Sequence, residues 1–279
     1  MNYKRILTIQ DISCVGQCSL TVALPILSAA GLECAILPSA VLSTHTAGFS
    51  GFTVRDLADD MPAINAHWVK EGIKFSAIYT GYLGTESQID MVLDIKNSSL
   101  EDGGLLIVDP AMADNGKLYP AFDESYAKAM VRLCAKADYV IPNITEACFL
   151  TGIEYKTEYD REYAFSLLYA LKKLGAKNVI LTGVSFKPDT TGIMVLEDGK
   201  CRYYEHELLK NSCHGTGDIY ASAFVGALVQ GLDAYESAKI AGDFTVDAIK
   251  ATAGDSSHWY GAKFEPVLGN YINCIKGRI

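Results

Sequence analysis

The sequence is short of several features that would place it in a common class. Its 24 Lys and Arg residues are outnumbered by 33 Asp and Glu residues, giving a formal net charge of −9, so no basic surplus can neutralise the phosphates of a nucleic acid or of an acidic membrane. No apolar run approaches the length of a membrane span, and the first residues lack the apolar core of a signal peptide. We therefore expect a cytoplasmic protein with no nucleic-acid or membrane partner.

Three chemical motifs are also missing. The eight cysteines form no Cys-x-x-Cys pair, so we expect reduced core thiols and neither a zinc site nor a disulfide framework. The absence of Gly-x-x-x-x-Gly-Lys-Ser/Thr disfavours a P-loop kinase. The absence of Gly-x-Gly-x-x-Gly after the first predicted strand disfavours a nicotinamide enzyme. A nucleotide substrate stays open, because a local anion site and a metal ion suffice to hold it.

What the sequence does contain is an alternation of strand-like and helical segments. Strands are predicted at residues 4–9, 33–37, 75–79, 105–108, 139–141 and 178–181, and helices at 18–30, 61–72, 86–96, 123–136, 161–174, 217–231, 235–252 and 266–276. Residues 192–196 and 200–206 read as a hairpin around a short turn. The alternation predicts an α/β fold with a doubly wound, mostly parallel central sheet flanked by helices. No linker or repeat interrupts it, so residues 1–279 are predicted to form a single domain.

The most informative motif is Gly215-Thr216-Gly217-Asp218, which precedes a small, apolar segment with helical spacing. A tight turn that enters a helix offers free N–H groups and the positive end of the helix dipole to an anion. Asp218 would repel a phosphate there unless it acts as a base toward a hydroxyl that attacks the phosphate. The pattern therefore favours phosphoryl transfer to an alcohol. A glycine turn in which Asp218 only caps the helix is the alternative.

Further polar residues follow the first three predicted strands, where ligands bind in parallel sheets. Asp11 and Ser13 lie in a turn that could hold a small substrate or cap a helix. His45 and Thr46 lie in a segment rich in glycine and aromatic residues, which could close over a flat ring or be a plain surface loop. Tyr82 could line the same pocket.

Carboxylates and amides follow the later strands. Asp109 and Asp114 are candidates to face Mg²⁺ through water. Asn143 and Glu146 lie three residues apart on one helical face, so they could serve Mg²⁺ and phosphate oxygens or form a structural capping box. Thr182 ends another predicted strand and could meet the phosphates of a nucleotide. Cys213 adjoins the anion motif and could have a lowered thiol pKa.

Taken in order, these motifs resemble the ribokinase-like superfamily and, within it, the pyridoxal kinase group. The superfamily resemblance rests on Gly215-Thr216-Gly217-Asp218, Asp109-Pro110 and Pro142-Asn143-x-x-Glu146. The closer resemblance rests on His45-Thr46, Thr80-Gly81-Tyr82 and Ala137-Asp138. Each motif is short, but their common order at strand ends is specific and covers nearly the whole chain.

The resemblance implies that MgATP phosphorylates the 5′-hydroxymethyl group of a B6 vitamer: pyridoxal, pyridoxine or pyridoxamine. Asp218 would be the base, and the backbone N–H groups of residues 215–217 would stabilise the transferred phosphoryl group. The residues facing the vitamer ring would be Asp11, Thr46 and Tyr82, and those around MgATP would be Asp109, Asp114, Asn143, Glu146 and Thr182. A homodimer and a response to a monovalent cation such as K⁺ are also implied.

Two departures and two alternatives accompany this interpretation. Asp11 stands where such kinases commonly have serine, and its carboxylate could favour a cationic vitamer such as pyridoxamine. Cys213 could capture the aldehyde of pyridoxal. The alternative functions are a hydroxymethylpyrimidine kinase of thiamin synthesis and a non-catalytic B6- or nucleotide-binding protein. Asp218 argues against the second, because binding alone has no use for a base in an anion site.

Overall fold

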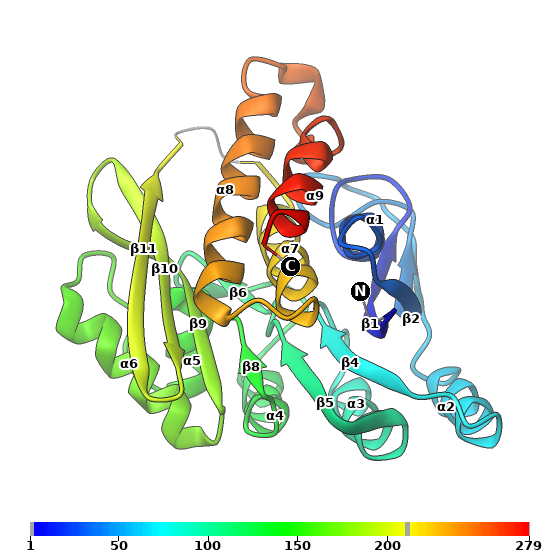
Figure 1. Ribbon diagram of the computed structural model, residues 1–279. Helices are drawn as coiled ribbons and strands as arrows, with labels where there is room; N and C mark the ends of the chain where they lie inside the picture. Colours follow the sequence, from blue (N-terminus) through cyan, green and yellow to red (C-terminus); the bar gives the residue numbers. More distant parts are fainter. Residues whose placement is uncertain (1–2, 210–212, 279) are drawn as a thin grey trace.

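The computed structural model describes residues 3–209 and 213–278, and it is built on one nine-stranded sheet (Figure 1). The order across the sheet is β11-β10-β9-β8-β5-β4-β1-β2-β3. The strands are β1 (Arg5–Ser13), β2 (Glu33–Leu42), β3 (Val54–Asp56), β4 (Phe75–Thr80), β5 (Leu100–Val108), β8 (Tyr139–Val140), β9 (Asn178–Lys187), β10 (Thr190–Glu197) and β11 (Lys200–Glu207). The run from β9 to β2 is parallel, and antiparallel strands form both edges. The predicted α/β fold with a mostly parallel sheet is confirmed.

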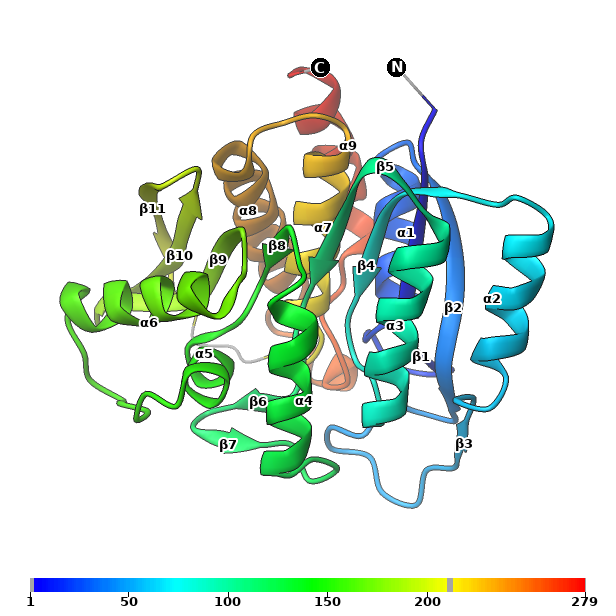
Figure 2. The ribbon, with the colours of Figure 1, turned by 90° about the horizontal axis from the view of Figure 1, so that it is seen from below.

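Helices cover both faces of this sheet. One face packs against α2 (Met61–Lys70), α3 (Glu86–Ser99), α4 (Glu124–Cys134), α5 (Ile144–Thr151) and α6 (Arg161–Leu174). The other packs against α1 (Leu20–Ala29), α7 (Thr216–Val229), α8 (Ala234–Thr252) and α9 (Leu268–Lys276). Figure 2 shows α3 and α4 on one side of the strands, with α7, α8 and α9 on the other. None of the described helices is both long and apolar enough to span a membrane.

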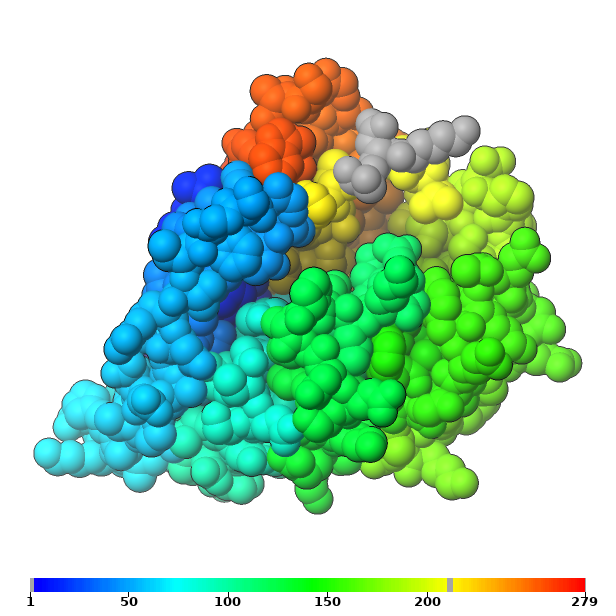
Figure 3. All heavy atoms as spheres, turned by 180° about the vertical axis from the view of Figure 1, so that it is seen from behind, coloured from blue at the N-terminus to red at the C-terminus, as the bar shows by residue number. Residues whose placement is uncertain are grey.

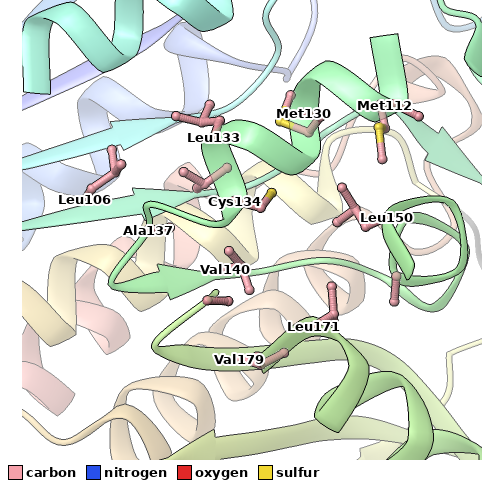
Figure 4. Close-up of a cluster of buried hydrophobic side chains, with 14 of the residues drawn as sticks. Leu106, Met112, Met130, Leu133, Cys134, Ala137, Val140, Leu150, Leu171 and Val179 are labelled. Atoms are coloured by element: carbon pink, nitrogen blue, oxygen red, sulfur yellow. The ribbon is translucent and has the colours of Figure 1, made fainter. Parts of the chain in front are cut away.

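Alternating residues of each strand pack into two separate hydrophobic cores, one on each face of the sheet. In β1, Leu7 and Ile9 enter the core under α2–α6, whereas Ile6 enters the core under α1 and α7–α9. Figure 4 shows the first core, where Leu106, Val140 and Val179 of three neighbouring strands meet side chains from the helices. Burial on both faces explains why strand segments such as residues 105–108 are continuously apolar.

The structure extends or corrects several predicted elements. β1 runs on to Ser13 through an irregularity between Gln10 and Ile12, so Asp11 and Ser13 lie within the strand and not in a turn after it. β9 continues to Lys187, so Thr182 lies inside that strand and not at its end. The final helix begins at Leu268, after the 3-10 turns Ser256–His258 and Glu265–Val267. All eight cysteines are free, but Cys14 and Cys274 are exposed and are not core thiols.

Some short elements were not predicted at all. The strand β3 pairs with the end of β2, and a two-stranded hairpin, β6 (Ala113–Asp114) with β7 (Lys117–Leu118), follows β5. This hairpin lies beside α5, which brings the segment after β5 to the start of that helix.

Candidate active site

The start of α7 is an uncapped helix N-terminus. Gly215 is its N-cap residue, with φ of 75° in the left-handed region, and no side chain among the described residues caps the helix. A Cβ atom on Gly215 would lie 1.7 Å from the carbonyl oxygen of Gln17, so only glycine fits against the β1–α1 loop. By contrast, a Cβ on Gly217 would meet nothing within 4 Å. The first N–H groups of α7 therefore have no side-chain acceptor, as an anion site requires.

Asp218 lies in the first turn of α7 and does not cap it, so the capping alternative for this residue is wrong. Its carboxylate is half-buried and faces the backbone N–H of Ser19, in the loop that joins β1 to α1. Burial raises the pKa of Asp218 to about 7, with Asp11 adding to the rise and the Ser19 N–H opposing it. A carboxylate with this pKa can accept a proton near neutral pH.

Asp109 lies near two other acids, Glu146 and Asp218. Asp109 follows β5 and is buried; burial, Glu146 and Asp218 hold its pKa well above the ordinary value. Glu146, on α5, is 3% exposed, and its two carboxylate oxygens accept the N–H groups of Met112 at 3.0 Å and Asn143 at 2.9 Å. Burial raises the pKa of Glu146 to about 7 despite these bonds. Asn143 accepts in return from the Glu146 N–H at 2.9 Å, so the capping box is present.

A cation that binds together with a phosphate ligand would compensate the carboxylates around Asp109. In the part of the chain that the structure describes, no Lys or Arg forms an ion pair with Asp109, Glu146 or Asp218. Nowhere in the described part of the chain do three or more His, Cys, Asp or Glu side chains come close enough together to hold a metal without other ligands. Mg²⁺ suits such a site, because it commonly binds one or two carboxylates, waters and substrate phosphates together.

Two of the predicted nucleotide residues, Asp114 and Asn143, line a cleft of about 460 Å³, whereas Asp109, Glu146 and Thr182 are not part of its lining. Asn143 donates from its side-chain nitrogen to the carbonyl of Ala113 at 2.8 Å, which ties α5 to the β6–β7 hairpin. The hydroxyl of Thr182 donates to the carbonyl of Pro142 at 3.3 Å. On the side of the molecule seen in Figure 3, the surface is hollowed between three segments: the light-blue segment near residues 43–52, the green segment after β5 and the yellow start of α7.

The predicted substrate residues Asp11, Ser13 and Tyr82 come together. Asp11 is 4% exposed and accepts the hydroxyl of Ser13 at 2.8 Å. The half-buried Tyr82 stands close enough to Asp11 for that carboxylate to raise the Tyr82 pKa, after the larger effect of burial. Burial also raises the pKa of Asp11, and no described Lys or Arg pairs with it.

His45 is buried and serves as an anchor of the 43–52 segment. One of its ring nitrogens accepts the N–H of Ala47 at 3.2 Å, and the other lies 2.6 Å from the carbonyl of Tyr260. Both nitrogens are therefore engaged within the protein. Phe49 packs on Trp259 with ring centroids 4.7 Å apart, so it is half-buried, whereas Thr46 is exposed.

The prediction of a lowered thiol pKa at Cys213 is wrong. The thiol is half-buried, and burial raises its pKa by disfavouring the thiolate. This weakens its candidacy as a nucleophile toward an aldehyde.

Sequence reasoning missed Ser19. Its φ of 55° and ψ of −131° are rare for a residue with a side chain, and this conformation turns its N–H toward Asp218. A glycine at this position would have signalled the unusual backbone, but serine does not.

These features define a class of protein: an α/β protein with a free helix N-terminus and acidic residues at the carboxyl edge of its sheet. The family model for phosphomethylpyrimidine kinase matches residues 25–263. The pyridoxal kinase of Dictyostelium discoideum is 28% identical over 241 residues, covering 80% of this chain and 77% of that protein. The hydroxymethylpyrimidine/phosphomethylpyrimidine kinase of Bacillus subtilis (strain 168) is 29% identical over 225 residues, covering 78% and 79%.

A solved structure extends the likeness over almost the whole chain. It is a Bacteroides thetaiotaomicron VPI-5482 protein, described as a phosphomethylpyrimidine kinase and crystallised with pyridoxal; it is 37% identical, with a TM-score of 0.91 and coverage of 97% of this chain and 96% of its own. The chain belongs to the pyridoxal and hydroxymethylpyrimidine kinases of the ribokinase-like superfamily. The resemblance drawn from the motifs is confirmed, and membership of a kinase family implies the use of ATP.

Proposed function

We propose that this protein transfers the γ-phosphoryl group of ATP to the 5′-hydroxymethyl group of a B6 vitamer. The observation that carries the proposal is the pairing, at the start of α7, of uncapped N–H groups with a carboxylate whose pKa is raised to about 7. An anion site alone would suit many ligands. An anion site with a neutral-range base suits an alcohol that must lose a proton as it attacks a phosphate.

Each part of the site has a role in this reaction. Asp218 accepts the hydroxyl proton of the substrate. The N–H groups at residues 215–217 donate to the oxygens of the transferred phosphoryl group, where stabilisation of developing charge contributes most. Asp11, Ser13 and Tyr82 hold the ring, and the 43–52 segment, anchored by His45, covers it. Asp114, Asn143 and Thr182 hold the nucleotide.

Magnesium is the metal that fits this donor set. Asp109 and Glu146 would hold it, through water and with the phosphates of ATP, and it would neutralise phosphate charge. The two carboxylates would remain ionised in its presence, because a cation favours the charged form of each.

A B6 vitamer is favoured over hydroxymethylpyrimidine by the pyridoxal bound to the 37% identical Bacteroides protein. Hydroxymethylpyrimidine kinase is the second candidate, favoured by the family match and by the Bacillus relative. Both substrates are flat heteroaromatic alcohols that the same site would phosphorylate in the same way. The carboxylate of Asp11, which has no Lys or Arg partner among the described residues, would accept an N–H group from either ring.

The test is ADP release from MgATP with five acceptors: pyridoxal, pyridoxine, pyridoxamine, hydroxymethylpyrimidine and ribose. We expect turnover of at least one B6 vitamer, and a loss of kcat of at least ~10²-fold in Asp218→Asn, as for removal of a general base. Asp233→Asn is the matched control, because Asp233 caps α8 beyond the far end of α7 and asparagine caps equally well. Turnover of hydroxymethylpyrimidine alone would select the second candidate. No turnover with intact ATP binding would instead favour a binding protein.

A further inference from the structure

A buried polar cluster lies directly beneath the candidate active site. Tyr79 in β4, Gln10 in β1 and Ser222 in α7 are each fully buried, at 0% exposure. The hydroxyl oxygens of Tyr79 and Ser222 and the side-chain oxygen of Gln10 have no hydrogen-bond partner within geometric limits among the described residues. Polar atoms are costly to bury without partners, so their presence in an otherwise apolar core calls for a functional reason.

The sheet register places these groups on one face. Tyr79 pairs with Thr8 in β1 and with Ile107 in β5, and its ring enters the core beneath α7. Gln10 follows Thr8 on the same face and binds its hydroxyl at 2.9 Å. Asp109 lies just after the end of β5, where its N–H donates to the carbonyl of Thr80, the residue after Tyr79, at 2.9 Å. The side chain of Tyr79 thus stands between β1, β5 and α7.

The helix supplies the remaining members. Asp218 and Ser222 are four residues apart in α7, so they lie on the same side of the helix, one turn from each other. Ser222 and Gln10 are the side chains that face the Tyr79 hydroxyl, and Asp109 and Asp218 are the charged groups nearest to it. Burial first, and then these two carboxylates, hold the pKa of Tyr79 well above its ordinary value, so Tyr79 is a neutral O–H donor.

We propose that Tyr79 is a positioning residue: its hydroxyl, together with Gln10 and Ser222, forms a buried polar support that fixes the carboxylates of Asp109 and Asp218 relative to each other. The inference rests on the proposed function, in which both acids act during phosphoryl transfer. Like charges held close together repel, and a neutral donor below them offsets part of that repulsion without adding a charge. The support joins three elements (β1, β4 and α7), so it links the anion site to the sheet.

Tyr220 provides a matched control. It is also a buried tyrosine, in α7, and its hydroxyl also lacks a partner among the described residues, but its pKa is raised by burial alone and no carboxylate contributes. Tyr79→Phe and Tyr220→Phe therefore delete the same atom from two similar environments, only one of which faces the acids.

The experiment measures kcat, both KM values and the Tm of the two variants, using the acceptor that the wild-type enzyme turns over best. We expect Tyr79→Phe to lower kcat by about 10-fold, the usual cost of losing a group that orients an active-site residue, with the KM values unchanged. Tyr220→Phe should keep the wild-type kcat. Ser222→Ala should repeat the selective fall in kcat, and it serves as the test if Tyr79→Phe does not fold.

Equal kcat values in the two phenylalanine variants, or a rise in KM with kcat unchanged, would overturn the inference while the proposed function stood. An unchanged kcat in Ser222→Ala would overturn it in the same way. A wild-type protein that turns over none of the acceptors would refute the proposed function first, and this inference with it.

Discussion

At the scale of single residues, the raised pKa of Asp218 predicts how activity depends on pH. The general base must be ionised, so kcat/KM for the acceptor should be constant above the Asp218 pKa of about 7 and fall about tenfold per pH unit below it. The measurement is a profile of kcat/KM between about pH 5.5 and 9 at saturating MgATP. If kcat/KM instead falls only near the ordinary pKa of a carboxylate, or if the same fall persists in Asp218→Asn, the titration belongs to another group.

For two glycines of the anion motif, we expect substitution by alanine to have different effects on the Tm. Gly215 has a φ of 75°, and a Cβ there would lie 1.7 Å from the Gln17 carbonyl, so Gly215→Ala should lower the Tm. Gly217 has open space around its missing Cβ, so Gly217→Ala should fold with a near-wild-type Tm. If phosphate lies over the first turn of α7, the added methyl group should nevertheless lower kcat/KM by about tenfold or more. A fully active Gly217→Ala would place the phosphate elsewhere.

At the scale of elements, Glu146 is a candidate for two roles: it closes the capping box at the start of α5, and it is proposed to hold Mg²⁺. Glutamine can accept only one of the two N–H groups that Glu146 now accepts, so Glu146→Gln should lower the Tm. It should also raise the Mg²⁺ concentration needed for half-maximal activity, because a charged donor is lost. Glu236→Gln is the matched control, since Glu236 occupies the corresponding position after the Asp233 cap of α8. A lower Tm with an unchanged Mg²⁺ titration would make Glu146 a purely structural residue.

The elements also show how far sequence could lead. Apolar strands such as residues 105–108 were predictable because burial on both sheet faces excludes polar residues from them. The extension of β1 through Asp11 was not, because polar residues suggest a turn unless a neighbouring strand, here the end of β2, supplies the pairing. The β6–β7 hairpin has two-residue strands, which carry no periodicity. The anion motif was predictable from its glycines, whereas Tyr79 looked like any apolar strand residue.

At the scale of the whole molecule, the acids of the site impose a cost on folding. The chain has a net charge of −9, and in the described residues Asp109 lies near Glu146 and Asp218, none of which has a Lys or Arg partner. Each has a pKa above its ordinary value in the folded protein. Between the ordinary and the raised pKa, the folded state binds more protons than the unfolded state, so the free energy of unfolding falls as pH rises through about 7.

Removing one of these charges should therefore stabilise the protein at alkaline pH. We expect Asp218→Asn to have a higher free energy of unfolding than the wild type at about pH 8 without Mg²⁺ or nucleotide, and the gain to shrink toward about pH 6, where the wild-type carboxyl is already largely protonated. Urea unfolding at the two pH values measures both proteins, with Asp233→Asn as the control that should follow the wild type. The variant would then trade activity for stability, because the charge that costs folding free energy is the one that accepts the proton. A variant less stable than the wild type at about pH 8 would mean that the Ser19 N–H compensates the Asp218 carboxylate fully, and the raised pKa would then be wrong.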